Sequence, residues 1–211
     1  VQQVVSTDLG LVVNAFEERE TAKRWYKAQQ LPKSESYSSE NLTRRDLTVA
    51  LYRLAGSPKV ELPETSPYPD VQPDDPDYAA IVWARQQSIT FGWVDGSFHP
   101  DAQLSTRSIV AFLYRYQRSR GKVSPILPTA APQPRNGSLP GSKDSELSTK
   151  YWATDLSEGS AFWRESQWAV QQHIWGYAED WRREDFTWPQ TTTYDLAVML
   201  YRMEHGGSHL R

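Results

Sequence analysis

One tripeptide, Leu-Tyr-Arg, occurs three times in this 211-residue chain, and this recurrence restricts the possible folds more than any other feature. It begins at Leu51, Leu113 and Leu200. Around each occurrence apolar residues recur with i, i+3, i+4, i+7 spacing, at Leu47, Ala50, Leu51 and Leu54, at Ile109, Phe112, Leu113 and Tyr116, and at Leu196, Met199, Leu200 and Met203. Because this spacing places the apolar side chains on one face of a helix, it predicts three related amphipathic helices.

Each predicted helix follows a hydroxyl residue that has a second polar residue three positions after it. The pairs are Thr43 with Asp46, Ser105 with Ser108, and Thr192 with Asp195. Such pairs are typical of helix N-caps, and the first and third approximate a capping box with Asp in place of Glu. The three helices are therefore expected to begin at the same place in a repeat.

A second, earlier helix also recurs, marked by a tryptophan with a glutamine four positions after it. The pairs are Trp25 with Gln29, Trp83 with Gln87, and Trp168 with Gln172. These helices are predicted to end near Leu31, Ile89 and Ile174. Since the three tryptophans occupy one equivalent helical position, we expect them to pack in the core rather than to stack on a ligand. Each repeat thus reads as helix, loop and helix.

The repeats divide the chain into residues 1–58, 59–120 and 150–211, named copies 1, 2 and 3 below. Between copies 2 and 3 lie residues 121–149, which carry five prolines and several Gly and Ser residues. This composition is typical of an extended linker or a surface strap.

The loop of copy 2 reads Gly92-Trp93-Val94-Asp95-Gly96-Ser97-Phe98-His99-Pro100 and is followed by Leu104-Ser105-Thr106-Arg107. It resembles the pattern of S-layer homology (SLH) domains, in which a Gly-aromatic-x-Asp-Gly-x-Phe-x-Pro loop leads into a Thr-Arg-Ala-Glu helix start. Upstream, Tyr68-Pro69-Asp70-Val71 is similar to the Phe-x-Asp-Val segment of that family. Together with the threefold recurrence, the resemblance covers nearly the whole chain outside the linker.

The resemblance implies an all-α, pseudo-threefold assembly, in which a central three-helix bundle carries three helix-loop-helix lobes separated by grooves. It also implies a non-catalytic module at the wall or surface of a bacterial cell, outside the membrane. Such a module anchors a surface protein by binding anionic secondary cell-wall polysaccharide in the grooves. In the family the motif arginine meets the carboxylate of a pyruvate ketal, for which a guanidinium fork is well suited.

The three copies depart from the SLH motif in different ways. Copy 1 alone has Thr-Arg followed by an acid, in Thr43-Arg44-Arg45-Asp46, but it lacks the Gly-aromatic-x-Asp-Gly loop. In copy 2, aligned on Leu-Tyr-Arg, Arg107 is displaced by one position, which is about 100 degrees around a helix. Copy 3 has no arginine there, since it reads Thr192-Thr193-Tyr194-Asp195. No single copy carries the complete motif.

The predicted ligand-binding residues are Thr43, Arg44, Asp46, Trp93, Asp95, Arg107, Trp175 and Tyr177. Arg44 is the first candidate for the anion, against the alternative of an ordinary solvated residue in a first helical turn. Thr43 and Asp46 have the alternative role of caps, and Asp95 that of holding its turn. The three aromatic residues lie in or beside loops, where they either line a groove or serve packing.

Composition and spacing argue against other functions. A formal net charge of −3 with scattered basic residues argues against nucleic acid as a partner, and no apolar run approaches the roughly 20 residues of a membrane span. There is no cysteine, and the four histidines lack metal-ligand spacing. Acidic clusters such as Asp74-Asp75-Asp77 fall where acids are common in any protein. We therefore expect no enzymatic activity, no metal and no cofactor.

A second function remains open from the sequence alone. Because the motif is incomplete in all three copies, the SLH scaffold could persist without its polysaccharide sites. The chain would then be a protein-protein interaction or surface-assembly module, with other surface proteins as partners.

Overall fold

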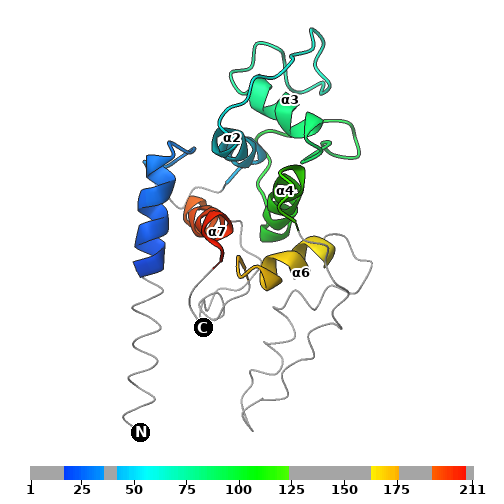
Figure 1. Cartoon of the computed structure of the whole chain (residues 1–211). Helices are drawn as coiled ribbons and strands as arrows, with labels where there is room; N and C mark the ends of the chain where they lie inside the picture. The colour runs from blue at the N-terminus through cyan, green and yellow to red at the C-terminus, as the bar shows by residue number, and fades with distance from the viewer. Residues whose placement is uncertain (1–16, 36–41, 124–162, 176–191, 208–211) are drawn as a thin grey trace, which may run out of the picture.

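The computed structural model describes residues 17–35, 42–123, 163–175 and 192–207. Within them lie the helical residues 17–28, α2 (Arg44–Leu54), α3 (Tyr78–Gln86), α4 (Thr106–Ser119), α6 (Trp163–Gln171) and α7 (Thr193–His205) (Figure 1). Apart from isolated bridges, such as the antiparallel one between Thr43 and Gln103, these residues form no β-structure. The predicted all-α class is confirmed for the described part of the chain.

The predicted helix starts are confirmed. Thr43 and Thr192 each close a complete capping box, with Asp46 and Asp195 as the partners three positions on. Ser105 accepts a hydrogen bond from the backbone N–H of Ser108 and so caps α4. These side chains satisfy N–H groups that the first helical turn leaves without a partner.

The earlier helix of each copy ends in one recurring geometry. Gln30, Ser88 and His173 have left-handed φ angles of 55°, 58° and 58°. The next residue in each copy donates its N–H to a carbonyl five positions back, from Leu31 to Tyr26 (3.5 Å), from Ile89 to Ala84 (2.9 Å) and from Ile174 to Ala169 (2.9 Å). This is a Schellman ending, which turns the chain sharply and buries the apolar residue that follows. The predicted helix ends are therefore confirmed in all three copies.

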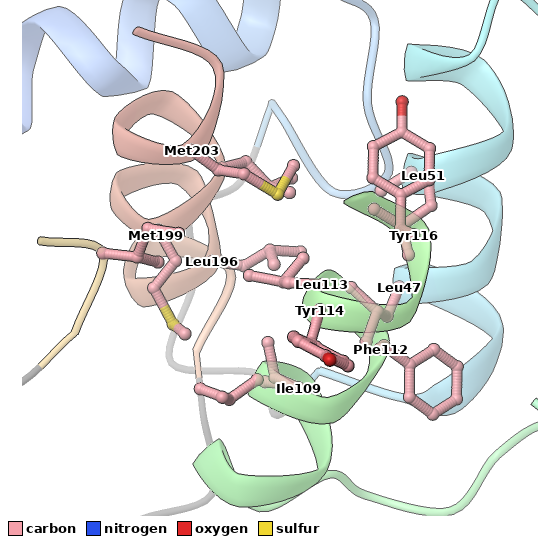
Figure 2. Packing of buried hydrophobic residues seen from close by; sticks show 14 of the residues in the cluster. Leu47, Leu51, Ile109, Phe112, Leu113, Tyr114, Tyr116, Leu196, Met199 and Met203 are labelled. Carbon is pink, nitrogen blue, oxygen red and sulfur yellow. The ribbon is translucent and has the colours of Figure 1, made fainter. Parts of the chain in front are cut away.

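The apolar stripes of α2, α4 and α7 meet in one core. Leu47 and Leu51, Ile109 and Leu113, and Leu196 and Leu200 are all fully buried in a single cluster. Figure 2 shows side chains of all three helices converging, with Leu113 of α4 beside Leu196 of α7. Trp83 and Trp168 are buried in the same cluster and Trp25 packs against it, so the predicted packing role of the tryptophans is confirmed.

The tyrosine of each Leu-Tyr-Arg packs on the tryptophan of another copy. The ring centroids lie 5.5 Å apart for Tyr52 and Trp83, 5.6 Å for Tyr114 and Trp168, and 5.8 Å for Tyr201 and Trp25, each pair edge to face. Copy 1 thus contacts copy 2, copy 2 contacts copy 3, and copy 3 returns to copy 1. The helix contacts agree with this order, since α2 packs on α3 and α4 packs on α6.

The arginine of each tripeptide reaches back to its own copy. Arg53 donates to the carbonyl of Gln30, Arg115 to that of Ile89 (3.3 Å) and Arg202 to that of Ile174 (3.3 Å). These carbonyls lie at the ends of the earlier helices, where backbone acceptors lack intrahelical donors. The recurrence of Leu-Tyr-Arg is therefore explained by three tasks: the leucine fills the core, the tyrosine joins the next copy, and the arginine ties the two helices of one copy.

These contacts close in a ring, as a pseudo-threefold arrangement requires. The superposition of whole copies about one axis stays a prediction, as do the copy boundaries. Most of the predicted linker, residues 124–149, lies outside the described residues. None of the described helices has both the length and the apolar character needed to cross a membrane.

The core assignment predicts a strong position dependence of leucine substitutions. Leu113→Ala is expected to lower the free energy of unfolding by about 2–5 kcal/mol, because Leu113 is fully buried among α2, α4 and α7. The matched control is Leu62→Ala, at a residue that is 50 % exposed, with an expected change within about 0.5 kcal/mol. Urea unfolding followed by circular dichroism measures both. Equal losses in the two variants would contradict the proposed core.

Candidate anion-binding site

The start of α2 in copy 1 lies against the motif loop of copy 2. The bridge between Thr43 and Gln103 holds the two segments, and the backbone N–H of Arg44 donates to the carbonyl of Ala102 (3.0 Å). The next N–H, of Arg45, donates to the carbonyl of Pro100 (2.9 Å). The Thr-Arg half of the SLH-like motif and the Gly-Trp loop half, which no single copy combines, are therefore brought together between copies 1 and 2.

Arg44 is buried at this junction, with 6 % of its surface exposed. Its Nε donates to the carbonyl of Phe98 (2.7 Å) and its Nη2 to the hydroxyl of Thr90 (2.9 Å). The guanidinium also lies over the rings of Phe98 and Phe112, at 4.9 and 5.2 Å from their centroids. The alternative of an ordinary solvated arginine is wrong, because the neighbouring copy encloses the side chain.

The guanidinium of Arg44 has only neutral hydrogen-bond acceptors. No carboxylate of the described residues lies within ion-pair distance of it, and burial lowers its pKa from the usual value. The carboxylate of Asp70 acts on it electrostatically, but both oxygens of Asp70 accept backbone N–H groups, from Phe98 (2.8 Å) and His99 (2.7 Å). A desolvated positive charge without a paired anion is unfavourable, so this environment suits an anionic ligand.

The motif loop is a turn held by several hydrogen bonds. The N–H of Trp93 donates to the carbonyl of Ser97 (2.8 Å), and Asp95 accepts the N–H of Ser97 (2.9 Å) and pairs with Nε2 of His99 (2.7 Å). The hydrogen bond from the N–H of Ser97 and, to a smaller extent, the one with His99 lower the pKa of Asp95. Gly92 has a φ of 84°, and a Cβ there would lie 2.5 Å from the carbonyl oxygen of Ser97, so only glycine fits. Asp95 thus fulfils its predicted turn role.

An apolar edge projects from this turn. Trp93 is 51 % exposed and stacks on His99, with ring centroids 4.1 Å apart. Phe91 and Val94 are still more exposed. Our sequence reasoning selected Trp93 but missed its two neighbours, although an apolar residue on either side of a glycine-tryptophan turn is a readable signal. The three exposed apolar side chains all lie within four residues of Thr90 in the sequence.

The remaining predicted site residues have varied positions. Thr43 and Asp46 serve as cap and cap partner, and Asp46 also pairs with Lys33 (2.8 Å). Trp175 is buried in the main cluster, where it packs rather than faces solvent. The backbone of Arg107 lies in the first turn of α4, whereas Tyr177 lies outside the described residues.

The acidic cluster of copy 2 is engaged by Arg45. Its Nη1 contacts Asp75 (2.6 Å) and Asp77 (2.8 Å), and its Nη2 contacts the second oxygen of Asp75 (3.0 Å). The hydrogen bond from Arg45 holds the pKa of Asp75 below its usual value. Arg45 of copy 1 and the two carboxylates of copy 2 therefore form a clasp between the copies. Among the described residues, no group of three or more metal-ligating side chains is found.

The position equivalent to Arg44 is occupied by Thr193 in copy 3. Thr193 is fully buried, and its hydroxyl oxygen has no hydrogen-bond partner in the part of the chain that the structure describes. The start of α7 therefore offers no guanidinium at this place. Of the Leu-Tyr-Arg helices whose first side chain is described, α2 and α7, only α2 begins with a buried positive charge.

Comparison of the chain with family models, with curated proteins and with solved structures finds no match. The resemblance to SLH domains therefore stays a prediction from the sequence motif.

The clasp predicts a pH-dependent contribution to stability. Arg45→Gln is expected to lower the free energy of unfolding at neutral pH by about 1–2 kcal/mol, because partly buried charged hydrogen bonds are lost. Since the folded-state pKa of Asp75 is lowered, this contribution is complete above the unfolded value of about 3.9 and disappears as the pH falls through the folded value. In urea unfolding, the difference between wild type and variant should therefore begin to shrink below about pH 4 and disappear at lower pH, once Asp75 is protonated in the folded state. As a control, Lys27→Gln removes a far more exposed ion pair with Glu35 and should change little at any pH.

Proposed function

We propose that this chain is a non-catalytic anchoring module that binds anionic cell-wall polysaccharide outside a bacterial cell. Its binding site lies where α2 of copy 1 meets the motif loop of copy 2. The observation that carries this proposal is the buried guanidinium of Arg44, which has neutral acceptors and no paired carboxylate among the described residues.

The charge balance of the site supports an anion as the ligand. A buried arginine normally has a carboxylate partner, since an unpaired charge in a low-dielectric environment is costly. Here the chain supplies carbonyl and hydroxyl oxygens instead, although acids are more numerous than basic residues overall. A carboxylate borne by a ligand would supply the missing charge and bind the fork of the guanidinium.

The turn beside Arg44 supports a sugar as the carrier of that carboxylate. Thr90 accepts hydrogen bonds from both Arg44 and the N–H of Gly92 (3.2 Å), so the charged site and the turn share one residue. The exposed indole of Trp93 offers a flat apolar face on which a sugar ring can stack. The carboxylate of Asp95, two residues later, can accept hydrogen bonds from sugar hydroxyl groups. Because the turn is held by several hydrogen bonds, little conformational entropy is lost on binding.

A protein-interaction module is the second candidate. The exposed apolar edge formed by Phe91, Trp93 and Val94 favours it, since large apolar side chains that project together mark interaction surfaces. A protein-interaction function does not explain why the charge of Arg44 is buried without a paired carboxylate. We therefore place it second.

The polysaccharide proposal predicts a specific loss on substitution of Arg44. Arg44→Met is expected to weaken binding to protein-stripped cell-wall fragments at least about tenfold, because charged hydrogen bonds to the ligand are lost. The variant should remain folded, with a loss of about 1–3 kcal/mol for the unpaired carbonyl of Phe98, which thermal unfolding checks. Cosedimentation with wall fragments measures the binding.

The control is Arg118→Gln, which removes the same charge from an exposed position on α4. It should bind as the wild type does. Equal retention of wild type and Arg44→Met would remove Arg44 from the mechanism, and retention only when other surface proteins are present would favour the protein-interaction module.

A further inference from the structure

Tyr68 places a hydroxyl group beside the charged site that the chain itself does not satisfy. The side chain is fully buried, and its hydroxyl oxygen has no hydrogen-bond partner among the described residues. A buried polar group without a partner is unfavourable and uncommon, so its position close to two arginines needs a physical explanation. The segment that Tyr68 begins resembles Phe-x-Asp-Val, so the hydroxyl is an addition of this chain to that pattern.

Two guanidinium groups lie close to the Tyr68 ring or to the ring packed on it. Arg85 lies over the Tyr68 ring, 5.2 Å from its centroid, and donates to the carbonyl of Phe91 (3.3 Å). The Phe98 ring, 5.3 Å from that of Tyr68, lies under Arg44. Neither arginine has a carboxylate within ion-pair distance in the described residues. The orphan hydroxyl donor and the buried cation of Arg44, with the partly buried Arg85 close by, favour an acceptor with negative charge.

We infer that Tyr68 is a ligand-binding residue, whose hydroxyl donates the second hydrogen bond to a single carboxylate-sized anion held by Arg44. The inference rests on the proposed function and adds a residue that sets its specificity. A carboxylate has two oxygens and can accept from Arg44 with one and from Tyr68 with the other. Arg85 adds a second positive charge close to the Tyr68 ring.

The hydroxyl is sealed in the structure, so the ligand must displace its cover. Gly92 lies directly against the Tyr68 ring, where a Cβ on Gly92 would be 2.8 Å from a ring carbon. We expect ligand binding to shift the turn that carries Gly92 and Trp93, so that the hydroxyl becomes accessible. Anion binding is expected to change the environment of the Trp93 indole, which reports on the same event by NMR.

The test compares three full-length proteins: wild type, Tyr68→Phe and Thr193→Val. Both variants remove a fully buried hydroxyl that has no partner, so neither should lower stability appreciably, and Thr193 lies at the start of α7, away from the motif loop. Sodium acetate is titrated against each protein at constant ionic strength, with sodium chloride as the balancing salt. The readouts are the melting temperature and the indole N–H resonance of Trp93, assigned with a Trp93→Phe sample.

The expected result is saturable acetate binding to wild type and Thr193→Val, and an affinity at least about fivefold lower for Tyr68→Phe. Equal acetate affinity in Tyr68→Phe and wild type would overturn the role of Tyr68, as would the absence of any saturable response in the wild type. A second series uses purified wall polymer, before and after chemical reduction of its carboxylates.

The two series separate the inference from the proposed function. If acetate binds in a Tyr68-dependent manner while wall polymer does not bind, the anion site stands and the anchoring function falls. If wall polymer binds wild type and Tyr68→Phe equally, the anchoring function stands and the role of Tyr68 falls. Loss of polymer binding on carboxylate reduction, together with weaker binding by Tyr68→Phe, supports both.

Discussion

The edge-to-face contact between a tyrosine of one copy and a tryptophan of another is the interaction on which the architecture depends. It occurs three times and joins copy 1 to 2, copy 2 to 3 and copy 3 to 1. A single pair of amphipathic helices cannot bury its own apolar face. In a closed ring of three such pairs every copy has a neighbour on both sides, so no copy has an uncovered end. Because the ring closes, α2, α4 and α7 share one core although long stretches of sequence separate them.

This closure decides where a binding site can form. Since each copy packs on the next, the helix start of one copy faces the loop of another, and a motif read along the sequence is divided in space. Copy 1 has the arginine without the loop, and copy 2 has the loop with its arginine displaced. The bridge between Thr43 and Gln103 joins these two halves, so the incomplete motif of each copy is compatible with the proposed site between copies 1 and 2.

Local rules written in the sequence gave correct predictions of helix starts, helix ends and buried stripes. Caps depend on residues three apart, and Schellman endings on a few consecutive residues, so both are visible in one chain. The surroundings of Arg44 were not predictable in this way, because Phe98, Thr90 and Phe112 belong to another copy and approach only through tertiary packing. For the same reason the sequence indicated neither the clasp of Arg45 nor the orphan hydroxyl of Tyr68.

If the proposed anchoring function holds, a module with a buried guanidinium at the start of α2 and none at that of α7 must gain its affinity differently from one with three equivalent sites. Several equivalent sites on a repeating polymer raise the effective concentration, and the affinity of each site can then be low. Here Thr193 replaces the guanidinium at the start of α7. Affinity would instead depend on the proposed site between copies 1 and 2, where a desolvated charge is in place before the ligand arrives and only a shift of the adjoining turn is needed to reach the Tyr68 hydroxyl. Preorganisation of this kind favours selectivity, because a ligand without the correctly placed carboxylate leaves Arg44 buried and unpaired.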